Sequence, residues 1–297
     1  MRVAVVGHVE WVHFARLHQL PRAGEIVHAW DPFEEPAGGG AVAAVQLARL
    51  AGGAVLVTAL GDDELGRRAA TRLAELGVEL WMAWRGEPTR RATTLVDERG
   101  ERTIVTLGPR HEPLSTDGDI PWESLGEMDA VYFTAGDAGA LAAARAARVL
   151  VASPRAQDAL GHGVELDGLV LSERDASERR EASEVEGQAR AVVRTEGASG
   201  GVYSTREGAT GSWPVAPAPA TTGDSYGCGD SFAAGLTYGL GAGMELERGL
   251  ALAARCGATC LGGRGPYERQ LSAADLSPAE RRDGRVGGDA RDVRAGA

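Results

Sequence analysis

Short apolar runs alternate along the chain with alanine-rich stretches of helical periodicity. The first run covers residues 3–6, and a helical pattern over 41–50 follows the glycines at 38–40. Further strand patterns cover 54–59, 130–134, 149–152, 168–171 and 191–195, and further helical patterns cover 63–76, 141–147, 230–240 and 246–259. Alternating strands and helices of this size predict a three-layer α/β fold, with a mainly parallel sheet covered by helices on both faces.

Two segments interrupt this alternation, at about residues 9–36 and 80–108. Both lack helical periodicity and carry turn signals. The second contains strand patterns at 93–96 and 102–107 around a turn, which is typical of a β-hairpin. We expect the two segments to pair into a small β-sheet lid that covers the mouth of the main sheet.

Four of the six tryptophans lie in these lid segments: Trp11, Trp30, Trp81 and Trp84. Aromatic residues on a small exposed sheet commonly bury against a partner. We therefore predict a homodimer formed through the lid, with most of these tryptophans in its contact. The alternative is that they stack on the apolar face of a sugar or a nucleobase.

The composition is that of an ordinary globular protein, with 43% hydrophobic and 25% charged residues. No apolar run approaches the roughly 18 residues of a membrane span, and the first residues read as a strand instead of a signal peptide. Cys228, Cys256 and Cys260 have no paired-ligand spacing, which favours a reduced, cytoplasmic compartment. The net charge of −11, without a basic cluster, argues against a nucleic-acid partner.

Lysine and asparagine are both absent, so all 31 basic residues are arginine. P-loop NTPases require a lysine on the phosphates and protein kinases require one in their third strand, so both classes are excluded. A dinucleotide-dependent oxidoreductase would need G-x-G-x-x-G directly after the first strand. Gly7-His8-Val9 does not match that pattern.

The sharpest chemical signal is the sequence D-S-Y-G-C-G-D-S-F at residues 224–232, which leads into a predicted helix. Glycines at this place let backbone N–H groups converge at the positive end of the helix, where they bind an anion such as a transferring phosphoryl group. Asp230 is suited to accept the proton of an attacking hydroxyl. The alternative is a glycine turn in which Asp230 only caps the helix.

The chain resembles the ribokinase-like carbohydrate kinases of the PfkB family along nearly its whole length, up to about residue 271. The family signature D-T-T-G-A-G-D-x-F corresponds to residues 224–232. Weaker matches follow in the family's order: V-V-G at 5–7, P-x-x-G-E at 21–25, P-x-G-G-G at 36–40, G-D-D-E-L-G at 61–66, G-E-R-T at 100–103 and T-E-G-A-S-G at 195–200. The resemblance implies a divergent member with one kinase domain over residues 1–272. The aperiodic segment 273–297 predicts a disordered tail.

The resemblance also implies an ATP-dependent kinase acting on a hydroxyl of a sugar, sugar-like or nucleoside acceptor. Asp230 would be the general base, and backbone N–H groups of Gly227, Cys228 and Gly229 would form the anion hole. The nucleotide would lie against Thr195, Glu196, Gly197, Gly200 and Ser172. The acceptor would lie against Glu10, Val12, Gly38, Gly39, Gly40, Val42 and Asp230. Mg²⁺ would arrive with the nucleotide near Asp175, and Asp224 would lie near a monovalent cation such as K⁺.

The acceptor positions depart from the family's pattern. The family's acceptor-binding aspartate falls at Val12 and its sugar-site asparagine at Val42. Glu10 and His13 flank the first position and could replace the aspartate. The N-x-x-E element near the metal is present only as S-E-R-D at 172–175. We expect fewer hydroxyl contacts than a ribose or fructose site needs, and a noncatalytic metabolite-binding or regulatory protein is the alternative function.

Overall fold

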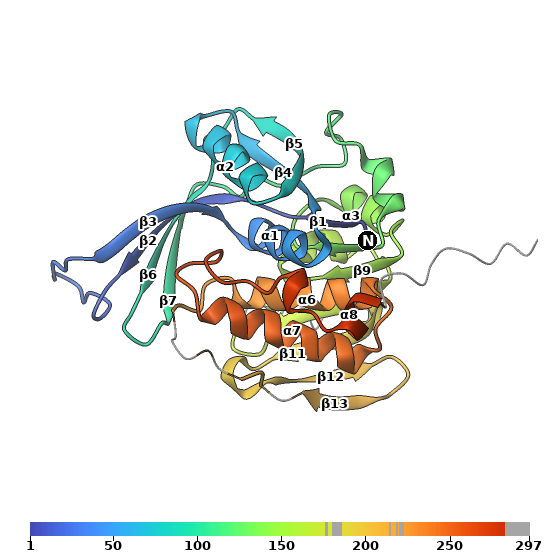
Figure 1. Ribbon diagram of the computed structural model, residues 1–297. Helices are drawn as coiled ribbons and strands as arrows, with labels where there is room; N and C mark the ends of the chain where they lie inside the picture. The colour runs from blue at the N-terminus through green and yellow to red at the C-terminus, as the bar shows by residue number, and fades with distance from the viewer. Residues whose placement is uncertain (176–177, 180–185, 214, 218, 220–222, 283–297) are drawn as a thin grey trace, which may run out of the picture.

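The computed structural model describes residues 1–175, 178–179, 186–213, 215–217, 219 and 223–282. Its centre is a nine-stranded sheet in the order β13-β12-β11-β10-β9-β8-β1-β4-β5 (Figure 1). The strands are β1 (Val3–Val6), β4 (Ala54–Gly61), β5 (Val78–Arg85), β8 (Ala130–Phe133), β9 (Val149–Ala152), β10 (Leu166–Ser172), β11 (Ala189–Thr195), β12 (Gly201–Thr205) and β13 (Thr210–Trp213). Neighbouring strands pair in parallel except at β11–β12 and β12–β13, so the predicted fold class is confirmed.

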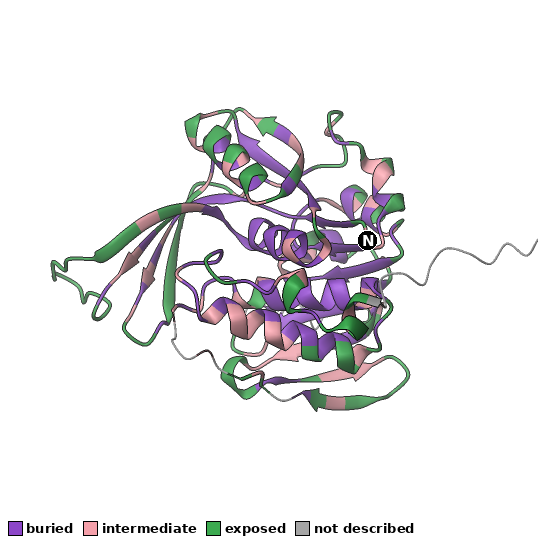
Figure 2. Ribbon diagram, in the orientation of Figure 1, coloured by how far each residue is buried: buried purple, intermediate pink, exposed green. Residues whose placement is uncertain are grey.

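Helices cover both faces of this sheet because both faces are apolar. Val3 and Val5 of β1 join one buried cluster, whereas Ala4 and Val6 join the other, as the alternation of side chains along a strand requires. The first cluster includes α1 (Gly39–Ala51), α2 (Glu64–Glu75), α6 (Cys228–Gly241) and α7 (Leu246–Leu261), and the second includes α3 (Ala138–Ala144) and α4 (Gln157–Leu160). Figure 2 shows the central strands and α1 in purple, the colour of buried residues.

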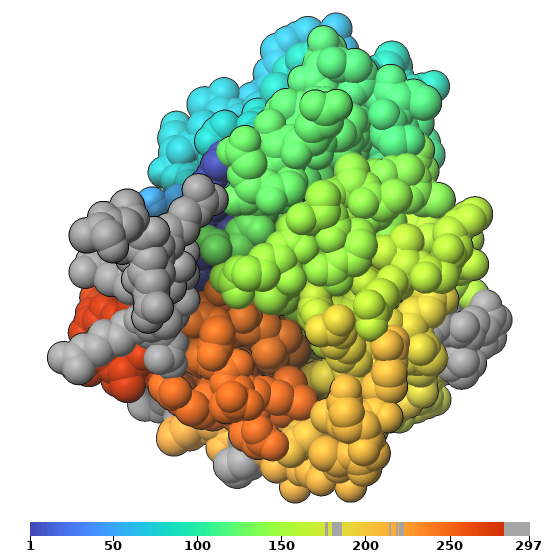
Figure 3. Space-filling model, turned by 90° about the vertical axis from the view of Figure 1, so that its right-hand side faces the viewer, coloured from blue at the N-terminus to red at the C-terminus, as the bar shows by residue number. Residues whose placement is uncertain are grey.

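The predicted lid is a second, four-stranded sheet in the order β3-β2-β6-β7. It is formed by β2 (Glu10–Arg16), β3 (Trp30–Ala37), β6 (Arg91–Val96) and β7 (Arg102–Leu107). The lid projects from one side of the main domain (Figure 1), and the opposite side is a rounded surface of main-domain segments (Figure 3). The two interruptions in the hydrophobic pattern therefore pair with each other as expected.

The second lid segment begins later than predicted, which places two of the four tryptophans outside the lid. Residues 80–85 belong to β5, which pairs with β4 over eight residues, so Trp81 and Trp84 lie on the edge strand of the main sheet. Trp11 is buried under the Arg68 guanidinium, and its indole N–H donates to Glu34. Only Trp30 of these four is an exposed lid residue.

The segment after residue 272 is ordered as far as the structure describes it. Residues 273–275 form a 3-10 turn, and α8 (Pro278–Arg282) follows, with Leu276 buried between them. Arg255 of α7 holds α8 through Glu280 at 2.6 Å. The prediction of disorder is therefore wrong for residues 273–282, and residues 283–297 lie outside the described part of the chain. No helix in the described part is long and apolar enough to cross a membrane.

Candidate active site

The signature at residues 224–232 forms the start of α6. Gly227 is the N-cap with a φ of 80°, and a β-carbon there would lie 2.9 Å from Val42 Cγ1, so both its backbone conformation and its packing require glycine. Gly229 faces open space, because a β-carbon there would meet nothing within 4 Å. The first turn of a helix has N–H groups without intrahelical partners, and here the Cys228 N–H reaches the Ser225 carbonyl at 3.4 Å.

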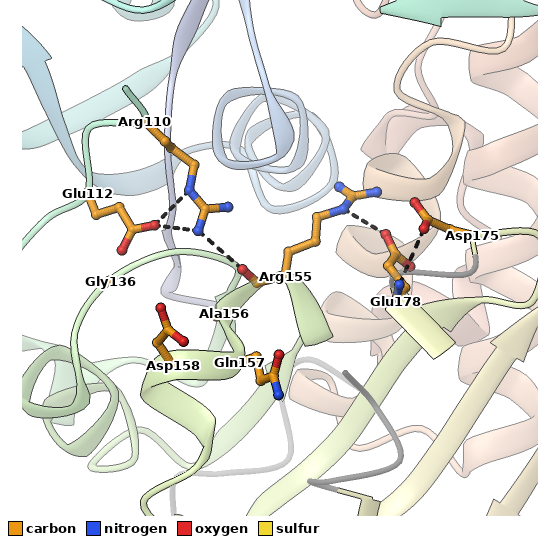
Figure 4. A pocket seen from close by; sticks show the side chains of 9 residues that line it. All are labelled: Arg110, Glu112, Gly136, Arg155, Ala156, Gln157, Asp158, Asp175 and Glu178. Atoms are coloured by element: carbon orange, nitrogen blue, oxygen red, sulfur yellow. Dashed lines mark hydrogen bonds and ion pairs between the residues drawn. The ribbon is translucent and has the colours of Figure 1, made fainter. Parts of the chain in front are cut away.

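Asp230 lies in the first turn of α6 but does not cap it, since the structure gives this helix no side-chain cap. Its Oδ1 accepts a hydrogen bond from Arg155 Nη1 at 3.1 Å. Arg155 follows β9 and also donates from Nε to Glu178 Oε1 at 2.7 Å, as Figure 4 shows. Glu178 Oε2 in turn accepts from the Ser172 N–H at 2.8 Å. Arg155 therefore connects Asp230 to the loop that follows β10.

The start of α1 also borders the Asp230 carboxylate, through Gly39. A β-carbon on Gly39 would lie 3.1 Å from Asp230 Oδ1, so this residue borders the carboxylate directly. A β-carbon on Gly40 would instead lie 2.7 Å from the backbone of Gly7 and His8, so Gly40 lets α1 pack closely on β1. Glycine at these two positions thus serves different purposes.

Glu10 is buried beside this space and forms an ion pair with Arg90 at 3.3 Å. Burial raises the pKa of Glu10, Arg90 opposes that rise, and nearby Asp230 adds to it. The pKa of His8 is held well below its usual value by burial and by Arg110, Arg155 and Arg90. Glu10 and Asp230 are therefore close enough to interact electrostatically.

Val12, Val42 and His13 do not lie where the acceptor was expected. Both valines are completely buried in the core, with Val42 packed beneath Gly227. His13 is on the opposite face of β2 from Val12, since consecutive strand residues point to opposite faces, and it pairs with Glu34 at 3.1 Å. The valines are wrong as acceptor contacts in this structure, and His13 is wrong as a replacement for the missing aspartate.

Tyr226 fills part of the space between the signature loop and the lid. Its hydroxyl accepts a hydrogen bond from the Gly38 N–H at 3.1 Å, and its ring meets Phe14 edge to face at 4.9 Å. Phe14 stacks in turn on Phe33 of β3 at 4.5 Å. Sequence reasoning noted Tyr226 only as a substitution in the signature and gave it no role.

Asp224 is fully buried and holds the signature loop in place. Its carboxylate accepts from the Tyr226 N–H at 3.1 Å and from the Gly265 N–H at 2.7 Å, and Arg16 lies 3.5 Å away. Burial raises its pKa despite these donors. Among the described residues, Oδ1 accepts only the Tyr226 N–H and has a second lone pair, so the expectation that Asp224 lies near a monovalent cation stays a prediction.

The positions expected to hold the nucleotide lie together at the ends of β10 and β11. Ser172 pairs with Thr195 across these strands, and Thr195 Oγ1 donates to the Leu171 carbonyl at 3.2 Å. The turn from Glu196 to Gly200 follows, closed by a hydrogen bond from the Glu196 N–H to the Gly200 carbonyl at 2.8 Å. Gly197 within the turn faces the Arg174 guanidinium.

A polar cavity of about 360 Å³ opens next to Arg155. It is lined by Arg110, Glu112, Gly136, Arg155, Ala156, Gln157, Asp158, Asp175 and Glu178 (Figure 4). Of the expected site residues, only Asp175 lies on this cavity. Sequence reasoning missed Arg155, although it directly follows a predicted strand, at the carboxyl end where open α/β sheets place their ligands.

Comparison with known proteins identifies the family. The pfkB family carbohydrate kinase model matches residues 1–160 and 164–273. A ribokinase of Dictyostelium discoideum is 29% identical over 115 residues, which are 38% of this chain and 36% of that protein. The matched stretch thus spans only about a third of that relative's length.

Solved structures of the family share the fold at low sequence identity. A microbiome-derived acarbose kinase has a TM-score of 0.75 and 21% identity, covering 96% of this chain and 99% of its own. The ribokinase of Arabidopsis thaliana, complexed with ribose and ATP, has a TM-score of 0.72 and 18% identity, covering 96% and 99%. A Thermotoga maritima ribokinase also reaches 0.72 at 18% identity, covering 93% and 97%. The chain belongs to the pfkB family of carbohydrate kinases.

Proposed function

We propose that this protein transfers the γ-phosphoryl group of ATP to a hydroxyl of a small sugar-like or nucleoside acceptor, with Asp230 as general base. The observation that carries the proposal is the position of Asp230. Its carboxylate belongs to the open first turn of α6 and borders Gly39, at the start of α1. A phosphoryl group on the helix side and a hydroxyl on the glycine side would meet at this carboxylate.

In this proposal the backbone at 227–230 stabilises the transferring phosphoryl group. The N–H groups of the first helical turn and the helix dipole both favour negative charge there. Gly229 supports this role because its α-carbon faces open space, so a phosphate can approach the backbone closely. As the acceptor oxygen bonds to the γ-phosphorus, the bond to the leaving ADP oxygen breaks and Asp230 takes the hydroxyl proton.

The nucleotide would lie against Thr195, Glu196, Gly197, Gly200 and Ser172, at the adjacent ends of β10 and β11. Mg²⁺ would neutralise charge on its phosphates and keep most of its water ligands. Asp175 offers carboxylate oxygen, which Mg²⁺ prefers, on the cavity beside Arg155. Turnover should therefore depend on Mg²⁺ or Mn²⁺, whereas folding should not.

Arg155 would hold Asp230 in place while the base acts. Its hydrogen bond occupies Oδ1, and Oδ2 can accept the hydroxyl proton. Because Arg155 also borders the cavity, a bound phosphate offers it a further partner. Arg155 would therefore compensate the negative charge of Asp230 in the free protein. During transfer it would also compensate the negative charge of the phosphoryl group.

The test is a nucleotide-consumption screen with MgATP across pentoses, hexoses, sugar acids, sugar phosphates and nucleosides. We expect ADP to be released only in the presence of one class of acceptor. The amount of ADP should equal the amount of phosphorylated acceptor. Consumption that no acceptor stimulates, or full activity after exhaustive chelation, would contradict it.

A further inference from the structure

The lid contacts each of the three residues that precede the proposed anion hole, at 224–226. Arg16 of β2 lies 3.5 Å from the Asp224 carboxylate, and the Tyr226 ring meets the Phe14 ring of β2 edge to face at 4.9 Å. The middle residue of the three contacts the lid hairpin formed by β6 and β7. The loop that leads into α6 is therefore held against the lid.

Ser225 is bound to this hairpin through both polar groups of its main chain. Its N–H donates to the Gly100 carbonyl at 2.9 Å. Its carbonyl accepts from Arg102 Nη1 at 3.0 Å, and its hydroxyl oxygen lies 3.1 Å from the same nitrogen. Because the guanidinium donor is charged, its bond to the Ser225 carbonyl is stronger than a bond between neutral groups.

The turn that carries these partners is itself fixed. The Asp97 carboxylate accepts from the main-chain N–H groups of Arg99 at 2.9 Å and Glu101 at 3.0 Å. Gly100 has a φ of 77° and donates to the Asp97 carbonyl at 3.0 Å. The hairpin therefore presents its carbonyl and guanidinium groups in a defined position.

The Ser225 carbonyl connects Arg102 to the start of α6. It also accepts from the Cys228 N–H, but at 3.4 Å, which is longer than the roughly 2.7–3.2 Å usual for such a bond. The N–H of the same peptide group, that of Tyr226, donates to Asp224 at 3.1 Å, so this group is held at both ends. Arg102 is thus the main partner of the carbonyl, and the Cys228 N–H keeps most of its capacity to bind an anion.

Loss of the Arg102 guanidinium would change this arrangement. The Ser225 carbonyl would keep the Cys228 N–H as its remaining donor, and the first turn of α6 could tighten onto it. A donor that is bound within the protein, or displaced, stabilises a transferring phosphoryl group less well than one already aligned with it.

We propose that Arg102 is a positioning residue for phosphoryl transfer, which holds the Ser225 peptide so that the Cys228 N–H is available to the phosphoryl group. This inference rests on the proposed function and deepens it, because it gives the lid hairpin a part in assembling the phosphoryl site. Arg102 acts through main-chain groups of the signature, so its effect should fall on the transition state more than on the binding of either substrate.

The experiment compares Arg102→Met with wild type in steady-state kinetics on the acceptor found by screening. The substitution should lower kcat about ten- to a hundredfold, because it removes a charged hydrogen bond. Both KM values should change by less than about threefold. Arg102→Lys should recover part of the loss, because its ammonium group can donate to the same carbonyl.

Arg99→Met is the matched control. Arg99 is an exposed arginine of the same hairpin, like Arg102, and its hydrogen bond to Asp97 comes from the main chain, which the substitution keeps. Its kcat should stay within about threefold of wild type. Equal losses of kcat in Arg99→Met and Arg102→Met, or no loss in Arg102→Met, would overturn the inference.

Hydrogen–deuterium exchange gives a second readout that needs no turnover. The main-chain amides of Ser225 and Tyr226 should exchange at least about threefold faster in Arg102→Met than in wild type, since the loop opens more often. A lower kcat with unchanged exchange would make Arg102 a direct contact of the substrate and overturn its positioning role. If Arg102→Met does not fold, both readouts are taken on Arg102→Gln, which also lacks the charge, with the same expected direction.

The two proposals fail separately. If the wild-type protein phosphorylates no acceptor, the proposed function is contradicted, and the exchange of Ser225 and Tyr226 still decides whether Arg102 holds this loop. If the wild type is active and neither kcat nor exchange changes in Arg102→Met, only the positioning role is contradicted.

Discussion

Arg155 Nη1 donates to Asp230 Oδ1 at 3.1 Å, while its Nε donates to Glu178 Oε1 at 2.7 Å. Both carboxylates are largely shielded from water, with side-chain exposures of 14% for Asp230 and 5% for Glu178. One guanidinium therefore compensates two shielded negative charges in the free protein. It also fixes the position of the proposed base relative to the loop after β10.

The first prediction concerns this arginine. Arg155→Met leaves both carboxylates without their charged partner, so the free energy of unfolding should fall by about 1–3 kcal/mol at pH 7, measured by urea denaturation. Arg190→Met is the control, because Arg190 is 58% exposed and its ion pair with Glu165 should contribute less than about 1 kcal/mol. Equal losses of unfolding free energy in the two variants would mean that Arg155 stabilises the protein no more than an exposed ion pair does.

The second prediction concerns pH. Burial, Arg110, Arg155 and Arg90 hold the pKa of His8 well below the usual value of a histidine, about 6.5. Below that pH the unfolded chain binds a proton on His8 that the folded protein does not, so this residue lowers stability as the pH falls. In His8→Asn this contribution disappears.

The stability advantage of wild type over His8→Asn should therefore shrink from pH 7 to pH 5, by up to about 1.4 kcal/mol per pH unit. Urea denaturation of both proteins at several pH values provides the measurement. A difference that stays constant across this range would mean that His8 keeps its ordinary pKa in the folded protein.

The third prediction separates the two glycines of the signature. Gly229→Ala should fold normally, since its β-carbon meets nothing within 4 Å, but the methyl group should crowd the phosphoryl site and lower kcat/KM about tenfold or more. Gly227→Ala should instead lose stability, because of its φ of 80° and the 2.9 Å approach to Val42. A fully active Gly229→Ala would place the phosphoryl group elsewhere.

The sequence predicts the layers and the lid because both depend on periodicity, which is local. The helix over residues 41–50 and the hairpin strands at 93–96 and 102–107 are close to their observed bounds. The helix expected at 141–147 begins earlier, at Ala138, because the Asp137 side chain caps it through the Ala140 N–H. The assignment of residues 80–85 to the lid failed because an edge strand exposed on one side has the same alternation as a lid strand.

The candidate site is less predictable because it depends on long-range contacts. The signature motif identified Asp230 and the glycines around it, but not the partner 75 residues away, Arg155. Val12 and Val42 were placed in the acceptor site by correspondence with the family, whereas the structure buries both in the core. Arg90 and Arg110 had no recognisable local pattern in a chain whose basic residues are all arginine.

The fourth prediction concerns association. β7 is an edge strand of the lid and exposes Ile104, Val105 and Leu107, so we expect a homodimer through the lid. Sedimentation equilibrium should give a dimer for wild type and a monomer for Val105→Asp. Val202→Asp is the control, because Val202 is also an exposed valine but lies on β12 of the main sheet. A monomeric wild-type protein, or a dimer unaffected by Val105→Asp, would refute the lid contact.

The fifth prediction tests the proposed mechanism most directly and uses Asp230→Asn. The substitution keeps the size of the side chain and removes the carboxylate that accepts the hydroxyl proton. Because α6 has no side-chain cap, the helix should not be affected, and nucleotide affinity should change little. The measurement is kcat for ATP-dependent phosphorylation of the acceptor found by screening, with nucleotide binding measured in parallel. We predict a loss of about 10²–10⁴-fold in kcat with a much smaller change in the acceptor KM. A kcat within about threefold of wild type would contradict the assignment of Asp230 as the general base.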